Sequence, residues 1–73
     1  MIVVSQPNCM PCKMTARKMT SLGIDHQYVD VSEVPELVEI AQAAGAMATP
    51  LVFRGTEFLW SGYRPDRMKE LAA

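Results

Sequence analysis

Two cysteines separated by two residues are the part of the chain best suited to covalent chemistry. Cys9 and Cys12 follow an apolar run and precede a segment with helical periodicity. A cysteine at a strand-to-helix junction lies at a helix N-terminus, where free N–H groups and the helix dipole favour the reactive thiolate. The second cysteine lies one turn away and can close a disulfide. The spacing predicts dithiol–disulfide exchange, with a structural cysteine pair or half of a zinc site as the alternatives.

A second candidate feature is Thr49-Pro50, which comes directly before a predicted strand. Proline removes a backbone donor, so this position suits the entry to a strand. One interpretation is an ordinary turn proline. The functional interpretation is a cis peptide bond packed against the cysteine pair, with the backbone of Thr49 offered to an extended substrate segment.

The elements that position these residues alternate along the chain. Short runs of apolar or β-forming residues predict four strands, at Met1–Ser5, His26–Val31, Leu51–Arg54 and Glu57–Trp60. Helical spacing with an opening proline in each case, and a closing glycine after the first two, predicts three helices, at Pro11–Leu22, Pro35–Ala44 and Pro65–Ala72. The order β-α-β-α-β-β-α predicts an α/β fold, with a four-stranded mixed sheet and helices on both faces. A Cys-x-x-Cys motif near such a βαβ pattern is typical of the thioredoxin fold.

Helical spacing also predicts which side chains enter the core. These are Cys12, Ala16, Met19, Leu22, Leu37, Ile40, Ala44, Met68 and Leu71.

Composition narrows the class of protein. The chain has 73 residues, so we expect one domain over residues 1–73. A net charge of −1 argues against a general nucleic-acid binder or a basic membrane-surface protein. The sequence shows neither a membrane-spanning apolar run nor a signal-peptide pattern, so we expect a cytoplasmic location. That compartment would reduce a structural disulfide, which favours a catalytic role for the cysteines.

The whole chain resembles the glutaredoxins, through its cysteine pair, its Thr49-Pro50 and its predicted strand order. One segment is similar to a more specific signature. Residues 60–67 read Trp-Ser-Gly-Tyr-Arg-Pro-Asp-Arg and closely resemble the Trp-Ser-Gly-Phe-Arg-Pro-Asp signature of the NrdH-redoxins. These are glutaredoxin-like proteins that behave as thioredoxins.

This resemblance implies a monomeric electron carrier without a bound cofactor or metal. Thioredoxin reductase would reduce it with electrons from NADPH, and it would pass them to a class Ib ribonucleotide reductase. Cys9 matches the attacking thiol and Cys12 the resolving thiol. The positions that would face a substrate are Met10, Pro11, Thr49 and the cis proline Pro50. The segment expected to shape the neighbouring surface consists of Trp60, Ser61, Gly62, Tyr63, Arg64, Pro65 and Asp66.

The chain also departs from the family pattern. Family members often carry Val-Gln or Met-Gln between the cysteines, whereas this chain has Met10 and Pro11. Tyr63 stands where the signature has Phe, which keeps the ring and adds a hydroxyl. These differences leave the redox potential and the exact partner open.

The competing enzyme class is a glutathione-dependent glutaredoxin. Such proteins usually hold the glutathione carboxylates with a basic residue near the cysteines and a polar turn after the last strand. Residues 6–8 contain no Lys or Arg, Lys13 is the nearest cation in sequence, and Asp66 already lies inside the last predicted helix. The charge clamp is therefore incomplete.

Non-enzyme classes remain as alternatives. A zinc site needs four ligands, and the chain offers two cysteines and His26. An iron–sulfur module would need a dimer that shares cysteines and glutathione. Pro11 within the cysteine motif disfavours such a module. A pure interaction module could use apolar surface near Met10, Met47 and Trp60, although such surface also suits docking for the exchange reaction.

Overall fold

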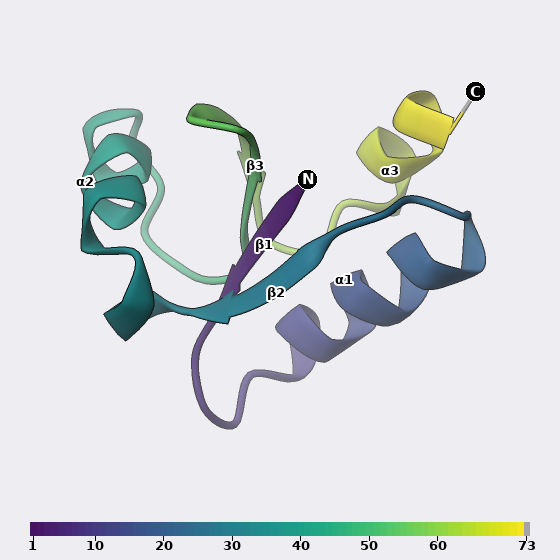
Figure 1. Ribbon diagram of the computed structural model, residues 1–73, viewed down its shortest axis with the longest axis horizontal. Helices are drawn as coiled ribbons and strands as arrows, with labels where there is room; N and C mark the ends of the chain where they lie inside the picture. The colour runs from purple at the N-terminus through teal and green to yellow at the C-terminus, as the bar shows by residue number, and fades with distance from the viewer. Residues whose placement is uncertain (73) are drawn as a thin grey trace.

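A four-stranded mixed sheet forms the centre of the molecule in a computed structural model, which describes residues 1–72 (Figure 1). The strands are β1 (Ile2–Ser5), β2 (Gln27–Asp30), β3 (Leu51–Arg54) and β4 (Glu57–Ser61). The helices are α1 (Met10–Ser21), α2 (Pro35–Ala43) and α3 (Pro65–Ala72), with a short 3-10 helix, η1 (Val31–Glu33). Each predicted helix and strand is confirmed to within one residue at either end. Only η1 was not predicted.

The strand order is β2-β1-β3-β4, which places β1 and β3 in the middle of the sheet. β1 runs parallel to β2, with Val3 beside Tyr28, as the crossover through α1 requires. β3 runs antiparallel to both β1 and β4. The α/β thioredoxin-like architecture expected from the sequence is thereby confirmed. Within residues 1–72, no helix is long and apolar enough to cross a membrane.

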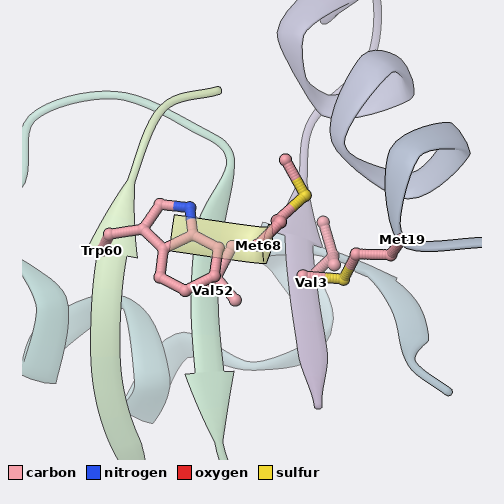
Figure 2. Packing of buried hydrophobic residues seen from close by; sticks show 5 residues of the cluster. All are labelled: Val3, Met19, Val52, Trp60 and Met68. Carbon is pink, nitrogen blue, oxygen red and sulfur yellow. The ribbon is translucent and has the colours of Figure 1, made fainter. Parts of the chain in front are cut away.

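The sheet separates two apolar layers, because alternate residues of a strand point to opposite faces. One layer lies beneath α1 and α3 and is shown in Figure 2; its buried members are Val3, Met19, Val52, Trp60 and Met68. The other layer lies beneath α2; its buried members are Val4, Leu37, Ala41, Leu51 and Phe53. Helices therefore cover both faces, with α1 and α3 on one side and α2 on the other (Figure 1).

A β-bulge in β4 assigns two aromatic residues to different layers. Val52 pairs with Trp60, but the next residue, Phe53, pairs with Phe58, so Leu59 is the extra residue. Phe58 and Trp60 would share a face in a regular strand. The bulge instead leaves Phe58 against Phe53 in the α2 layer, with ring centroids 5.5 Å apart, and brings Trp60 into the α1–α3 layer.

Two predicted core positions are wrong. Ile40 is 39% exposed and Ala44 is also exposed, whereas Ala41 is fully buried beside Leu37. The stripes 37-40-44 and 37-41 both have helical spacing, and contact with the sheet selects the second. Thr15 of α1 was not predicted to enter the core. It is fully buried, and its hydroxyl donates a 2.9 Å hydrogen bond to the carbonyl of Pro11.

The short helix η1 begins at a polar cap. The Asp30 carboxylate accepts hydrogen bonds from the hydroxyl and the backbone amide of Ser32, and these two bonds lower the pKa of Asp30. An Asp followed two residues later by Ser was the sequence signal for this turn.

Candidate redox site

Cys9 and Cys12 form a disulfide, with their Cα atoms 5.3 Å apart. Cys9 is the N-cap of α1, directly before the first helical residue, and Pro11 occupies the first turn, where its missing N–H leaves no bond unmade. Cys12 lies in that same turn and is fully buried, whereas Cys9 is 7% exposed. Of the two cysteines, Cys9 is therefore the one that offers exposed surface to a partner.

The sulfur of Cys9 accepts two hydrogen bonds. The backbone amide of Cys12 lies 3.2 Å from Sγ, and the Thr49 hydroxyl lies 3.4 Å from it. A disulfide sulfur carries no proton, so the Thr49 hydroxyl is the donor here. No acidic residue occupies the first turn of α1. After reduction, both donors and the helix dipole would favour negative charge on Cys9.

Thr49-Pro50 is a cis peptide bond, as the functional interpretation predicted. Pro50 is fully buried, and its carbonyl accepts a 2.8 Å hydrogen bond from the amide of Gly62. Thr49 is partly exposed, and within residues 1–72 its backbone amide and carbonyl make no hydrogen bond. An edge of unpaired backbone therefore lies beside the disulfide, and such an edge can pair with an extended segment of another chain.

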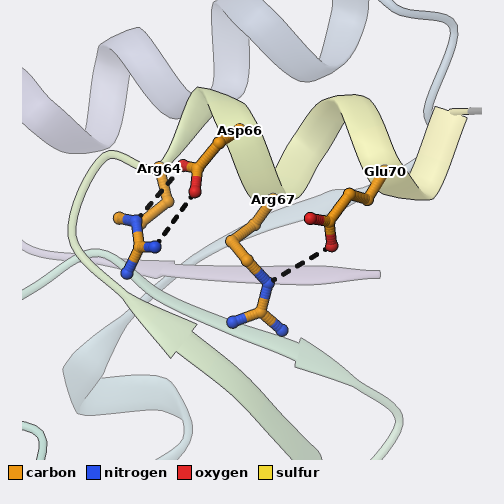
Figure 3. Close-up of polar contacts among 4 residues, drawn as sticks. All are labelled: Arg64, Asp66, Arg67 and Glu70. Carbon is orange, nitrogen blue, oxygen red and sulfur yellow. Dashed lines mark hydrogen bonds and ion pairs between the residues drawn. The ribbon is translucent and has the colours of Figure 1, made fainter.

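Residues 60–66 join the end of β4 to the start of α3. Trp60 is 4% exposed and lies in the core, with Tyr63 packed against the same layer. The guanidinium of Arg64 makes two hydrogen bonds to the carboxylate of Asp66, at 3.0 and 3.2 Å, as Figure 3 shows. Arg67, one residue beyond the segment, lies over the Trp60 ring, with Cζ 5.3 Å from the ring centroid.

The structure joins some of the sequence-predicted residues and separates others. Cys9, Cys12 and Thr49 are linked by hydrogen bonds, and Pro50 is linked in turn to Gly62. Two further predicted substrate positions, Met10 and Pro11, are exposed beside the disulfide, Met10 by 63%.

Trp60 cannot contribute to an exposed apolar surface with Met10 and Met47, because it is buried; that expectation is wrong. Met47, by contrast, is 96% exposed. Arg64 and Asp66 bond to each other at the surface, and neither bonds to the cysteines. The hydrogen bond from Gly62 to Pro50 had no sequence signal beyond the presence of a glycine.

Near the site, the charged groups Arg64 and Asp66 act mainly on each other. Arg64 lowers the pKa of the Asp66 carboxyl, with further help from the backbone amides of Arg67 and Asp66, and Asp66 raises the pKa of Arg64 in return. Within residues 1–72, no cluster of three or more His, Cys, Asp or Glu side chains is present that could hold a metal ion.

Comparison with known proteins agrees with this geometry. The glutaredoxin family model matches residues 1–59, which include the disulfide and the cis proline. A solved structure of the glutaredoxin-like protein NrdH-redoxin from Escherichia coli superimposes with a TM-score of 0.80 at 34% identity, covering 96% of this chain and 91% of that one.

Curated relatives extend the likeness over nearly the whole chain. The glutaredoxin-like protein NrdH of Escherichia coli K12 is 35% identical over 69 residues, which are 94% of this chain and 84% of the relative. The NrdH protein of Lactococcus lactis subsp. cremoris is 34% identical over 96% of both chains. The Gene 56 protein of Mycobacterium phage L5 is 36% identical over 94% of this chain and 68% of its own length. The chain therefore belongs to the glutaredoxin family, as an NrdH-like glutaredoxin-like protein with a Cys-x-x-Cys disulfide.

Proposed function

We propose that the chain is a dithiol–disulfide oxidoreductase that carries electrons from thioredoxin reductase to protein disulfides, above all the disulfide of a class Ib ribonucleotide reductase. The observation that carries the proposal is the environment of Cys9. Cys9 is the partly exposed residue of the pair, and its sulfur accepts two hydrogen bonds and lies beside the unpaired backbone of Thr49. This arrangement favours a thiolate next to an edge that can hold an extended substrate. The proposal places the protein in the cytoplasm, with NADPH as the indirect source of electrons.

Each turnover moves two electrons and two protons to the substrate. The thiolate of reduced Cys9 attacks one substrate sulfur, which forms a mixed disulfide and releases the other substrate sulfur as a thiolate that takes up a proton. Cys12 then loses its proton, and its sulfur attacks the sulfur of Cys9. This step closes the Cys9–Cys12 disulfide and releases the second substrate thiol. Because Cys12 is fully buried, Cys9 is the partner that it can reach.

The charges around the site favour thioredoxin reductase over glutathione as the reductant. Glutathione is an anion whose carboxylates need free cations or free helix N-terminal amides. The first turn of α3 already holds the carboxylate of Asp66. Arg64 is occupied by the same carboxylate. A glutathione carboxylate would therefore meet a neutralised site at this end of α3.

Two coupled assays test the proposal. The oxidised protein is incubated with NADPH and thioredoxin reductase, or with NADPH, glutathione and glutathione reductase, and NADPH absorbance is followed with a class Ib ribonucleotide reductase as acceptor. We expect turnover with thioredoxin reductase and little with glutathione. Cys9→Ser is the inactive control. Equal turnover with glutathione would instead support the glutathione-dependent alternative.

Single replacements in residues 60–66 test whether this segment recognises the reductase. Tyr63→Phe and Arg64→Gln alter side chains at or near the surface, whereas Trp60→Phe alters the core. Thermal stability and the rate of reduction by thioredoxin reductase are measured for each variant. A variant of Tyr63 or Arg64 that keeps its stability but is reduced more slowly supports recognition. Rates that fall only in proportion to stability leave the segment a structural role alone.

A further inference from the structure

Cations and acids are unevenly distributed between α1 and the segment that contains α2. Residues 1–24 contain three cations and no acid, and all three cations, Lys13, Arg17 and Lys18, lie on α1. Residues 25–53 contain five acids and no Lys or Arg. Because α1 and α2 cover opposite faces (Figure 1), the cations of α1 and the acids Glu36 and Glu39 of α2 lie on opposite sides of the sheet. This separation would orient a charged partner before contact.

A groove lies between α1 and the loop before α3. Met14, Arg17, Lys18 and Ser21 line it from α1, and Tyr63 lines it from the loop before α3. The four α1 residues have the spacing i, i+3, i+4 and i+7, so they form one stripe on the helix surface. Met10 lies one turn before Met14, and both are exposed, so the stripe continues to the disulfide.

The cations of this stripe are available to a partner. The ion pairs within residues 1–72 join Arg64 to Asp66 and Arg67 to Glu70, and neither Arg17 nor Lys18 takes part in one. Two unpaired cations beside exposed methionine side chains suit a segment that carries both carboxylates and apolar groups.

We propose that this groove, defined by Met14, Arg17, Lys18, Ser21 and Tyr63, binds an acidic polypeptide segment next to the disulfide of the partner protein. The inference rests on the proposed function and adds the chemistry of the substrate. Arg17 lies seven residues after Met10, a rise of about 10 Å along the helix. An extended chain covers that distance in about three residues. The carboxylates would therefore lie three or four residues from the cysteine that Cys9 attacks.

A polypeptide fits this surface better than a nucleic acid does. The chain has a net charge of −1, and the groove offers only two cations, Arg17 and Lys18, which are neighbours in the sequence. A backbone of regularly spaced phosphates would require a longer basic track.

Three synthetic peptides provide the test. Each contains the same internal disulfide, and positions three and four beyond one cysteine are Glu-Glu, Gln-Gln or Lys-Lys. The second-order rate constant for reduction by the reduced protein is measured by rapid mixing at low salt and at about 0.5 M salt, where charges are screened within a few ångströms. We expect the acidic peptide to react about fivefold faster than the neutral one at low salt, the basic peptide to react slowest, and the differences to vanish at high salt.

Matched variants locate the effect. The double variant Arg17→Gln/Lys18→Gln should bring the ratio of acidic to neutral rates to about one. Arg54→Gln/Lys69→Gln removes the same net charge elsewhere and should keep the ratio. A preference that survives in the first variant, or that disappears equally in the second, overturns the groove as the site. Inhibition of acidic-peptide reduction by a short single-stranded DNA at micromolar concentration would also overturn it, in favour of a general anion surface.

The same experiment separates the two proposals. If none of the three peptides is reduced, the proposed dithiol–disulfide exchange itself fails. If all three are reduced at the same rate, the exchange function stands and only the assignment of the groove fails.

Discussion

The amide of Gly62 donates a 2.8 Å hydrogen bond to the carbonyl of Pro50, and this bond ties the end of β4 to the cis-proline loop. Gly62 has a φ of +84°, a left-handed conformation that side chains disfavour. A Cβ added at Gly62 would meet no atom within 4 Å, so the glycine is required by its backbone conformation and not by lack of space. Residues 60–66 therefore help to position the loop that carries Thr49.

Replacing this glycine should lower both the free energy of unfolding and the rate of reduction, and a control variant distinguishes the two effects. We expect Gly62→Ala to lower the free energy of unfolding by about 1 kcal/mol, the usual cost of a left-handed alanine. It should also slow reduction by thioredoxin reductase several-fold, because the Pro50 loop loses its fixed neighbour. Gly23→Ala is the matched control, since Gly23 has a φ of +73° and equally open surroundings at the far end of α1. Equal losses of rate in both variants would contradict a positioning role for Gly62.

The two cysteines should differ sharply in reactivity. Cys9→Ser should abolish attack on a disulfide, whereas Cys12→Ser should stop after the first step and accumulate a mixed disulfide with the substrate. Mass spectrometry under non-reducing conditions detects that adduct. In the reduced wild-type protein, iodoacetamide should modify Cys9 much faster than the buried Cys12 near neutral pH. Equal alkylation rates of the two thiols would rule out this division of roles.

The hydroxyl of Thr49 should adjust the pH dependence of the reaction. It donates to the sulfur of Cys9 at 3.4 Å, so it favours the charged form after reduction. Thr49→Val should shift the pH–rate profile of Cys9 alkylation to higher pH and reduce the rate below the midpoint about fivefold, equivalent to about 1 kcal/mol. Thr49→Ser keeps the donor and should restore the wild-type profile. A valine variant with an unchanged profile would show that the hydroxyl has no electrostatic role.

Local signals in the sequence were sufficient for most of the fold. Prolines at 35 and 65 open α2 and α3, and glycines at 23 and 45 follow α1 and α2, so the ends of the elements were predictable within one residue. The cysteine spacing and Thr49-Pro50 also identified the two main parts of the candidate site.

The remaining features depend on contacts between distant residues. Whether Ile40 or Ala41 faces the sheet depends on how α2 rotates against Leu51 and Phe53, and both choices have helical spacing. The bulge at Leu59, which brings Trp60 beneath α1 and α3, appears only when β3 and β4 pair. For the same reason, neither the hydrogen bond from Gly62 to Pro50 nor that from Thr49 to Cys9 could be predicted from local sequence signals.

Acid titration should detect the ion pair at the start of α3. Arg64 lowers the pKa of Asp66 below its ordinary value of 3.8. Asp66 binds its proton less tightly in the folded state than in the unfolded state. The contribution of the ion pair to stability is therefore complete above about pH 4, and it is lost as the pH falls through the lower pKa that Asp66 has in the folded state. We expect Arg64→Gln to raise the pKa of Asp66 towards 3.8 in an NMR titration of the carboxyl groups.

Asp30 serves as the internal control for that titration. Its pKa is lowered by hydrogen bonds from Ser32, so it should stay unchanged in Arg64→Gln. A shift in the pKa of both carboxyls would indicate a general change of fold. An unchanged pKa of Asp66 would mean that Arg64 does not pair with it in solution.

Arg67 should stabilise the protein through Trp60. Its guanidinium lies over the indole ring, with Cζ 5.3 Å from the centroid, whereas its contact with Glu70 is long, at 3.9 Å, and exposed. Arg67→Met keeps most of the aliphatic length but loses the cation over the ring, so we expect a loss of about 0.5–1 kcal/mol in the free energy of unfolding. Glu70→Gln should change it by less than about 0.3 kcal/mol, since an exposed pair contributes little. Urea unfolding followed by the fluorescence of Trp60, the one tryptophan in the chain, measures both variants. If the Glu70 variant lost as much stability as the Arg67 variant, the ion pair and not the aromatic contact would account for the effect.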